Sequence, residues 1–168
     1  MNWDLTRPGE IETAAPTLFN AGLVFIGVIR TPYLTRDDCP RQGSADGPMC
    51  RIEVADLWKP ALKGLEAYER IEVLYWMHQA RRDLLVQNPK SDGMTFGTFA
   101  LRSPVRPNPI ATASCVLVAV ENGAVLVRGL DCVDGTPLLD LKPDRRGFVP
   151  QATPNPGEVT RGETSAAN

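Results

Sequence analysis

The sequence predicts a mainly β protein, folded as a compact single-domain β-barrel of short antiparallel strands with brief helical segments. Three observations favour this fold class. Short runs of β-branched and aromatic residues recur along the chain, turn signals rich in glycine, proline, asparagine or aspartate separate them, and the helical pieces between them are brief. A chain of 168 residues, 43% hydrophobic and 23% charged, has the size and composition of one domain with one core.

Two strands are predicted before residue 60. Residues 23–29 (LVFIGVI) have strand composition, and the stretch 36–49, rich in aspartate, glycine and proline, predicts a long loop. A short strand is expected around residues 51–54, and a brief helical turn near 56–64. Pro60 excludes a long helix there, because proline has no amide hydrogen to donate within a helix.

Residues 70–79 (RIEVLYWMHQ) predict a strand with two different faces. Because side chains alternate along a strand, one face carries Ile71, Val73, Tyr75 and Met77, and the other carries Glu72, Leu74, Trp76 and His78. The second face mixes polar and aromatic residues, as in a surface, a pocket lining or a covered sheet face. His78 is therefore either a structural histidine or a ligand contact.

Three further strands are predicted at residues 98–101, 114–120 and 124–130. Between the last two, Glu121-Asn122-Gly123 is a hairpin signal, because asparagine and glycine readily adopt the positive φ angles of tight turns. Asp134-Gly135 is a second hairpin signal. In this sequence no strand is followed by a glycine-rich loop and a long amphipathic helix, which excludes a Rossmann-type fold.

The two ends of the chain differ in composition from its middle. Residues 1–20 lack clear periodicity and are expected to form an N-terminal extension, the domain itself is expected at 21–145, and 146–168 are expected to form a flexible C-terminal tail. The first residues include acidic side chains and prolines instead of a basic region followed by an apolar stretch. A cytoplasmic location is therefore predicted. The apolar runs are too short to span a bilayer, so no membrane association is predicted.

Charge and cysteine usage narrow the possible partners. The formal net charge of −2 and the pI near 5.4 give no overall attraction for nucleic acid, so any RNA contact would use a local basic patch. The four cysteines form no C-x-x-C pair and one histidine is available to join them, so no metal site is predicted. These cysteines, expected to be reduced, are Cys39, Cys50, Cys115 and Cys132.

A stiff loop is predicted at residues 102–110 (RSPVRPNPI), because each proline restricts its own backbone and that of the preceding residue. Such a loop could hold Arg102, Arg106 and Asn108 ready for a ligand. Arginine suits carboxylates and phosphates, and asparagine can read an adenine edge. The alternative is a rigid structural corner whose arginines are solvated, and composition leaves both interpretations open.

Residues 129–143 (GLDCVDGTPLLDLKP) place Asp131, Asp134 and Asp140 around a predicted turn. Carboxylates there could bind ribose hydroxyls, offset a positive charge or accept a proton. Alternatively, an aspartate in such a turn caps its own backbone. In the long loop, Pro40-Arg41-Gln42 is either an anion contact or a segment with a solvated arginine.

Together these segments resemble, in order and spacing, the signature blocks of the TsaA-like (YaeB/TrmO) family over residues 23–143. The blocks are IGVIRTPY (26–33), PRQG (40–43), GLEAYERIEVLYWMHQ (64–79), FALRSPVRPNPIA (99–111) and GLDCVDGTPLLDLKP (129–143). The combination of RPNPI with D-x-x-DGTP-x-x-D-x-KP is highly specific.

The resemblance implies a β-barrel methyltransferase that is commonly dimeric and binds S-adenosylmethionine, with residues 21–145 as the TsaA-like domain. Characterised bacterial members methylate N6 of threonylcarbamoyladenosine beside the anticodon of threonine tRNA, so tRNA is the expected substrate. Carried over by position, the cofactor pocket would comprise Pro40, Arg41, Gln42, His78, Gln79, Arg102, Thr112, Leu130, Asp131, Asp134, Gly135 and Thr136.

The resemblance does not assign a separate role to each residue of that site. Asp131 and Asp134 are both candidate general bases. Candidate substrate or RNA contacts are Arg30, Arg106, Asn108 and Lys142. Two other functions stay open, namely methyl transfer to a small molecule and a non-catalytic module that responds to S-adenosylmethionine.

Many bacterial relatives continue into a second domain, whereas this chain ends in a tail of low hydrophobicity. RNA docking is therefore expected to depend on arginines, pooled across a homodimer. These are Arg30, Arg36, Arg41, Arg81, Arg82, Arg102 and Arg106.

Overall fold

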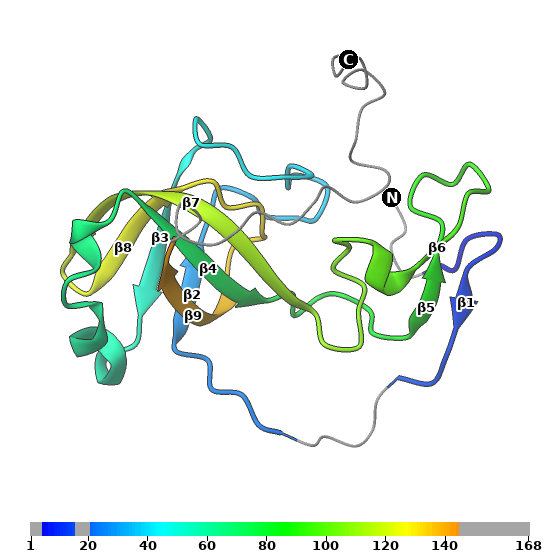
Figure 1. Cartoon of the computed structure of the whole chain (residues 1–168), viewed down its shortest axis with the longest axis horizontal. Coiled ribbons are helices and arrows are strands. Elements are labelled where there is room, and N and C mark those ends of the chain that lie inside the picture. The colour runs from blue at the N-terminus through cyan, green and yellow to red at the C-terminus, as the bar shows by residue number, and fades with distance from the viewer. Residues whose placement is uncertain (1–4, 16–20, 145–168) are drawn as a thin grey trace, which may run out of the picture.

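The computed structural model describes residues 5–15 and 21–144, and six strands of that part close into a barrel (Figure 1). Around the barrel the order is β2-β3-β8-β7-β4-β9, and neighbouring strands are antiparallel. The strands are β2 (Gly27–Arg30), β3 (Met49–Val54), β4 (Arg70–Trp76), β7 (Ile110–Glu121), β8 (Ala124–Arg128) and β9 (Thr136–Pro143). The predicted mainly β barrel is confirmed.

Alternating burial along the strands fills the barrel with apolar side chains. In β4, Ile71, Val73 and Tyr75 are at most 2% exposed, while the residues between them are partly exposed. Ile52 of β3 and Val127 of β8 are fully buried in the same core cluster. Side chains thus occupy the interior of this small barrel, so a ligand site has to be built at the ends of the strands.

The hairpin predicted at Glu121-Asn122-Gly123 joins β7 to β8. Glu121 pairs with Ala124 across the turn, and Asn122 and Gly123 have φ angles of 51° and 74°. Left-handed backbone at both central residues matches the twist of the flanking strands, as in other two-residue hairpins. The prediction of this hairpin is confirmed.

The prediction of a hairpin at Asp134-Gly135 is wrong. A turn is present, with Gly135 at φ 79°, but it joins β8 to β9, which are not neighbours in the barrel. Instead, β9 pairs with β2 and β4. The dipeptide specifies a local reversal of the backbone, and the reversal alone does not determine which strands pair.

Short 3-10 helices connect the strands. Of these, η1 (Asp56–Leu62) contains Pro60 and confirms the brief helical turn predicted near 56–64; η2 (Leu65–Ala67) follows it. A third, η3 (Thr98–Ala100), occupies the position of the strand predicted at 98–101, so that prediction is wrong. The buried hydroxyl of Thr98 donates to the Leu84 carbonyl at 2.6 Å, which turns the chain inward where a strand would continue straight.

The first barrel strand begins at Gly27, later than the predicted start at residue 23. Gly27 lies opposite Val54, the last residue of β3, so residues 23–25 extend beyond the end of their neighbour and their side chains are exposed. Strand composition does not reveal where the partner strand stops.

A second, three-stranded sheet lies outside the barrel (Figure 1). It contains β1 (Ile11–Glu12), β5 (Leu84–Gln87) and β6 (Phe96–Gly97), in the order β1-β5-β6. Sequence analysis missed these strands because they are too short to show an alternating pattern. It also missed β9, since proline at positions 137 and 143 resembles a loop.

In the described part of the chain, no helix is long and apolar enough to cross a membrane, and no three His, Cys, Asp or Glu side chains group in a way that could hold a metal ion. The C-terminal tail expected at 146–168 lies outside the described residues.

Candidate functional site

One end of the barrel collects nearly all of the predicted site residues. Here β2, β4 and β8 end, and β3, β7 and β9 begin, as the pairs Arg30–Arg51, Met49–Arg128 and Trp76–Ile110 require. We call this the site end; its connections are residues 31–48, 77–109 and 129–135. The predicted cofactor residues lie on these three connections, at the start of β9 (Thr136), or near the start of β7 (Thr112).

Two of the connections are in backbone contact. A Cβ atom on Gly43 would lie 1.8 Å from the carbonyl oxygen of Gly129, a distance that only glycine permits. The Pro40–Gly43 block therefore rests against the start of the 129–135 connection. Segments that are far apart in the sequence form one surface because of this contact.

Asp131 is held by the core. The hydroxyl of the buried Tyr75 donates a hydrogen bond to Oδ1 of Asp131. Burial raises the pKa of the Tyr75 hydroxyl, and the neighbouring carboxylate raises it further, so Tyr75 remains a donor. Among the described residues, no hydrogen bond or ion pair involves the second carboxylate oxygen of Asp131. That oxygen can still accept a bond from a ligand.

The charge of Asp131 influences the surrounding thiols. Burial, followed by Asp131, raises the pKa of Cys39 to about 11 and that of Cys115 to about 12. Cys132 is shifted upward too, by burial and more weakly by Asp131. The negative charge of Asp131 therefore acts on all three of these thiols, and it would favour a cation bound beside it.

This potential can be measured through Cys39, which is partly exposed while the other three cysteines are buried. With its pKa near 11, the Cys39 thiol is protonated at pH 8 and should react slowly with iodoacetamide. Asp131→Asn removes one cause of the upward shift, so the pKa should fall and the alkylation rate at pH 8 should rise roughly 2- to 5-fold. Asp46→Asn, in the same long loop, serves as the control. The alkylation rate is measured by mass spectrometry of the Cys39 peptide. Equal rates in wild type and Asp131→Asn would mean that the charge of Asp131 does not affect the Cys39 thiol.

Asp134 has a different environment. Its Oδ1 accepts a hydrogen bond from the Thr31 amide at 3.1 Å, and Oδ2 lies 3.5 Å from Nη1 of Arg30. Its own amide donates to the Tyr33 carbonyl at 2.7 Å. Asp134 thus joins the end of β2 to the β8–β9 connection, instead of capping its own turn as the structural alternative supposed.

The loop at 102–110 is anchored at both ends. Nη2 of Arg102 donates to the Thr112 carbonyl at 3.1 Å, which brings two predicted pocket residues into direct contact. Nε of Arg82 donates to the Pro107 carbonyl at 2.6 Å, and its guanidinium lies 5.4 Å from the centre of the Trp76 ring. The stiffness predicted from the prolines is therefore reinforced by arginine contacts with the backbone.

The remaining residues of the predicted pocket fall into an exposed group and a buried group. Pro40, Arg41, Gln42, His78 and Gln79 are exposed at the site end, where their side chains are accessible to a ligand. Leu130 and Thr136 are 1% exposed, so their side chains belong to the core and only their backbone can face a ligand. Gly135, in the turn before Thr136, is partly exposed.

The predicted RNA contacts are not all brought together. Arg30 ends β2 at the site end, where it also contacts Glu53 at 3.0 Å, and Arg106 and Asn108 lie on the anchored loop. Lys142 pairs with Glu72 towards the other end of the barrel, and its ammonium group forms a 2.6 Å ion pair with Asp140. Lys142 is therefore separated from the other three.

Sequence reasoning did not include Tyr75 among the site residues. The alternating pattern of residues 70–79 placed its ring correctly in the core. A buried phenol usually needs a hydrogen-bond partner, and this rule was the available signal that Tyr75 reaches a polar group.

Two surface hollows lie at opposite ends of the barrel. One, of about 430 Å³, lies beside Arg30, Thr31 and Met49 at the site end. The larger, of about 610 Å³, lies at the opposite end, between η1 and the β7–β8 turn. Only the first adjoins residues of the predicted site.

The barrel and its connections match a known family. Residues 28–149 fit the family model of the tRNA-methyltransferase O (TrmO) N-terminal domain. The chain belongs to the TrmO family. A TrmO-family relative in Rhizobium radiobacter, named "Probable S-adenosyl-L-methionine-binding protein VirR", is 52% identical over 146 residues, which cover 87% of this chain and 83% of that protein.

Two further similar proteins have longer chains. The mouse protein named tRNA (adenine(37)-N6)-methyltransferase is 33% identical over 155 residues, covering 83% of this chain and 36% of its own length. The crystal structure of TrmO from Pseudomonas aeruginosa matches with a TM-score of 0.67 and 28% identity, covering 84% of this chain and 64% of that one. The present chain therefore spans less than two thirds of either protein.

Proposed function

We propose that this chain is an S-adenosylmethionine-dependent methyltransferase that modifies N6 of threonylcarbamoyladenosine next to the anticodon of tRNA. The observation that carries the proposal is that the PRQG, RSPVRPNPI and GLDCVDGTP blocks lie at one end of the barrel, where the first touches the third and Tyr75 holds the partly buried Asp131. The names of the similar proteins agree with it, because they include binding of S-adenosylmethionine and methylation of tRNA adenine.

The residues at the site end fit a sulfonium cofactor. Asp131 contributes a negative charge, which adds to burial in raising the pKa of Cys39, and keeps one carboxylate oxygen available. The exposed side chains of Gln42, His78 and Gln79 supply hydrogen-bonding groups on the connections at the same end of the barrel. Arg102 supplies a guanidinium suited to the cofactor carboxylate.

When bound, S-adenosylmethionine supplies an electrophilic methyl group on a positively charged sulfur. The protein's part is to hold the nucleophile in line and to exclude water, which needs rigid loops. Arg82 and Arg102 provide this rigidity through their bonds to the Pro107 and Thr112 carbonyls.

Of the two candidate bases, we assign proton acceptance to Asp131. Both oxygens of Asp134 face donors, the Thr31 amide and the Arg30 guanidinium, so this carboxylate already has structural partners. Asp131 has one donor, Tyr75, and can accept a proton from the substrate nitrogen. Asp134 then acts as a positioning residue that fixes the connection carrying Asp131.

We further propose that residues 21–145 are the functional domain and that it works as a homodimer in the cytoplasm. The net charge of −2 offers no general attraction for RNA, so arginines at the site end would neutralise phosphates locally. Arg41 and Arg102 are exposed there, and Arg106 lies on the same loop as Arg102. A dimer would double this basic surface.

Calorimetric titration with S-adenosylmethionine and S-adenosylhomocysteine tests the cofactor first. Micromolar binding, followed by methyl transfer to threonylcarbamoylated threonine tRNA, is the expected result. Binding without transfer to this tRNA or to small acceptors would replace the enzyme with an S-adenosylmethionine-responsive module. Failure to bind either compound would refute the proposal.

Arg102→Ala is expected to weaken S-adenosylmethionine binding about 10-fold in the same titration, because an arginine–carboxylate contact is lost. Lys63→Ala, which removes an exposed positive charge directly after η1 at the opposite end of the barrel, is the control. An unchanged dissociation constant in Arg102→Ala would remove the 102–110 loop from the pocket.

A further inference from the structure

Phe99 is an exposed aromatic residue beside the proposed site. Its side chain is 79% exposed, the largest fraction among the exposed large hydrophobic residues of the described chain. It lies in η3 (Thr98–Ala100), directly before the loop that carries Arg102 and Arg106. Leu34 and Leu57 are exposed to a similar extent, so Phe99 is set apart by the position of its ring before this loop and not by exposure alone.

The backbone beneath Phe99 is firmly held. Thr98 is 3% exposed; its hydroxyl donates to the Leu84 carbonyl at 2.6 Å and accepts from Nε2 of Gln87 at 3.0 Å. Gln87 also donates to the Val105 carbonyl at 2.8 Å. These bonds fix η3 and the following loop relative to each other, so the ring of Phe99 extends outward from a rigid base.

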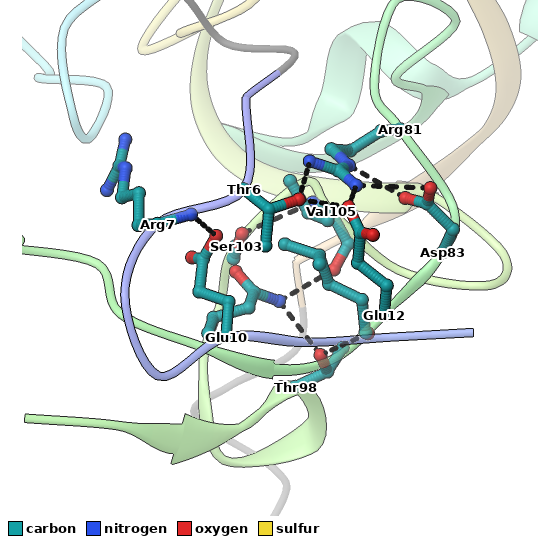
Figure 2. A network of polar contacts seen from close by, with 11 residues as sticks. Thr6, Arg7, Glu10, Glu12, Arg81, Asp83, Thr98, Ser103 and Val105 are labelled. Carbon is teal, nitrogen blue, oxygen red and sulfur yellow. Dashed lines mark hydrogen bonds and ion pairs between the residues drawn. The ribbon is translucent and has the colours of Figure 1, made fainter.

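The small sheet strengthens that base. Figure 2 shows Arg81 between Glu12 and Asp83, in the same network as Thr98 and Val105. The guanidinium of Arg81 bonds to Glu12 at 2.5 Å and to Asp83 at 2.7 Å, which joins β1 to the chain leading into β5. The second sheet thus supports the segment that presents Phe99.

A fixed positive charge lies beside the ring. The guanidinium of Arg106 lies 5.7 Å from the ring centre, and its Nη1 donates to the Leu101 carbonyl at 2.5 Å, which holds it in place. Between Asp92 and Glu121, the two charged residues are Arg102 and Arg106. An aromatic ring beside a fixed arginine, in a segment without acidic residues, suits nucleic acid, which combines negative phosphates with flat bases.

We propose that Phe99 and Arg106 form a stacking platform for a nucleobase of the RNA substrate, next to the base that is methylated. This inference rests on the proposed function. Unpaired bases of a loop stack on aromatic side chains and arginine planes, while arginines neutralise the adjoining phosphates. The arginines favour RNA over an apolar protein partner, which would have to bury these charges.

Binding of an anticodon stem–loop of threonine tRNA, measured by fluorescence anisotropy, tests the platform. Phe99→Ala should weaken binding roughly 10- to 100-fold, since one stacked base is lost, while Phe99→Trp should stay close to wild type. The salt dependence of binding should not change in Phe99→Ala, but its slope should fall by about one in Arg106→Gln. Leu57→Ala, equally exposed in η1 at the other end of the barrel, is the control.

S-adenosylmethionine affinity of Phe99→Ala should equal that of wild type, which shows that the variant is folded. RNA binding by Phe99→Ala equal to that of Leu57→Ala would overturn the platform. Conversion of a dimer to a monomer in sedimentation by Phe99→Ala would also overturn it and assign the ring to an interface between copies.

The platform and the proposed function can fail separately. If the wild-type protein binds the stem–loop, Phe99→Ala weakens that binding and no methyl group is transferred, the proposed function fails and Phe99 remains an RNA-stacking residue. If wild type and Phe99→Ala methylate the RNA with equal kcat/KM, only the platform fails. Absence of RNA binding by the wild type would overturn both.

Discussion

Asp131→Asn is expected to weaken S-adenosylmethionine binding about 10- to 100-fold while S-adenosylhomocysteine binding changes less than about 3-fold. The two compounds differ in the charge on sulfur, and Asp131 is the carboxylate whose field extends across the site end. At a separation of roughly 6–8 Å and an effective dielectric constant near 20, one opposite charge contributes about 2–3 kcal/mol. Calorimetric titration of both compounds measures the ratio directly.

The same substitution should reduce methyl transfer further, by at least about 100-fold in kcat, because the amide cannot accept the substrate proton. Tyr75→Phe is the matched variant, since it removes the hydrogen bond to Asp131 and keeps the charge. It should retain the preference for S-adenosylmethionine. An equal loss of affinity for both compounds in Asp131→Asn would mean that Asp131 acts through the shape of the site, not through its charge.

Gly43→Ala is expected to separate the PRQG block from the 129–135 connection. The new Cβ would lie 1.8 Å from the Gly129 carbonyl oxygen, so backbone has to move by more than an ordinary side-chain adjustment. Overpacking of this kind costs about 1–3 kcal/mol. Urea unfolding should show that loss of stability, and calorimetry should show at least about 10-fold weaker S-adenosylmethionine binding.

Gly22→Ala is the control for this experiment, because an added Cβ there has no heavy atom within 4 Å. It should leave both stability and affinity unchanged. Wild-type affinity in Gly43→Ala would show that Arg41 and Gln42 do not need the contact with Gly129 to take part in the site.

Sequence patterns correctly predicted the features that depend on neighbouring residues alone. The alternation of residues 70–79 correctly buried Ile71, Val73 and Tyr75, since inward and outward positions follow from strand geometry alone. Asn122 and Gly123 predicted their hairpin because their positive φ angles are a property of those residues.

Predictions failed where a distant partner decided the outcome. Residues 98–101 have strand composition, yet the bonds of Thr98 to Leu84 and Gln87 form a 3-10 turn. The first strand is shorter than its apolar run because β3 ends at Val54. Propensity has no information about where a neighbouring strand begins or ends.

The candidate site, too, combines features set by local sequence with features set by distant partners. The resemblance of the blocks to a family supplied the candidate pocket residues, but composition could not separate the two aspartates. Asp134 has its partners, Arg30 and Thr31, at the end of β2, and Asp131 has its partner, Tyr75, in the core. Each partner is more than forty residues away in the sequence.

The sequence by itself determined the mainly β class, the inward face of β4, the β7–β8 hairpin and the family, because each depends on residue types at short or fixed spacing. Only the tertiary structure decided that connections 31–48, 77–109 and 129–135 lie at one end of the barrel and that Tyr75 holds Asp131. Closure of the barrel brings together strand ends that are distant in the chain, and no local pattern encodes that closure.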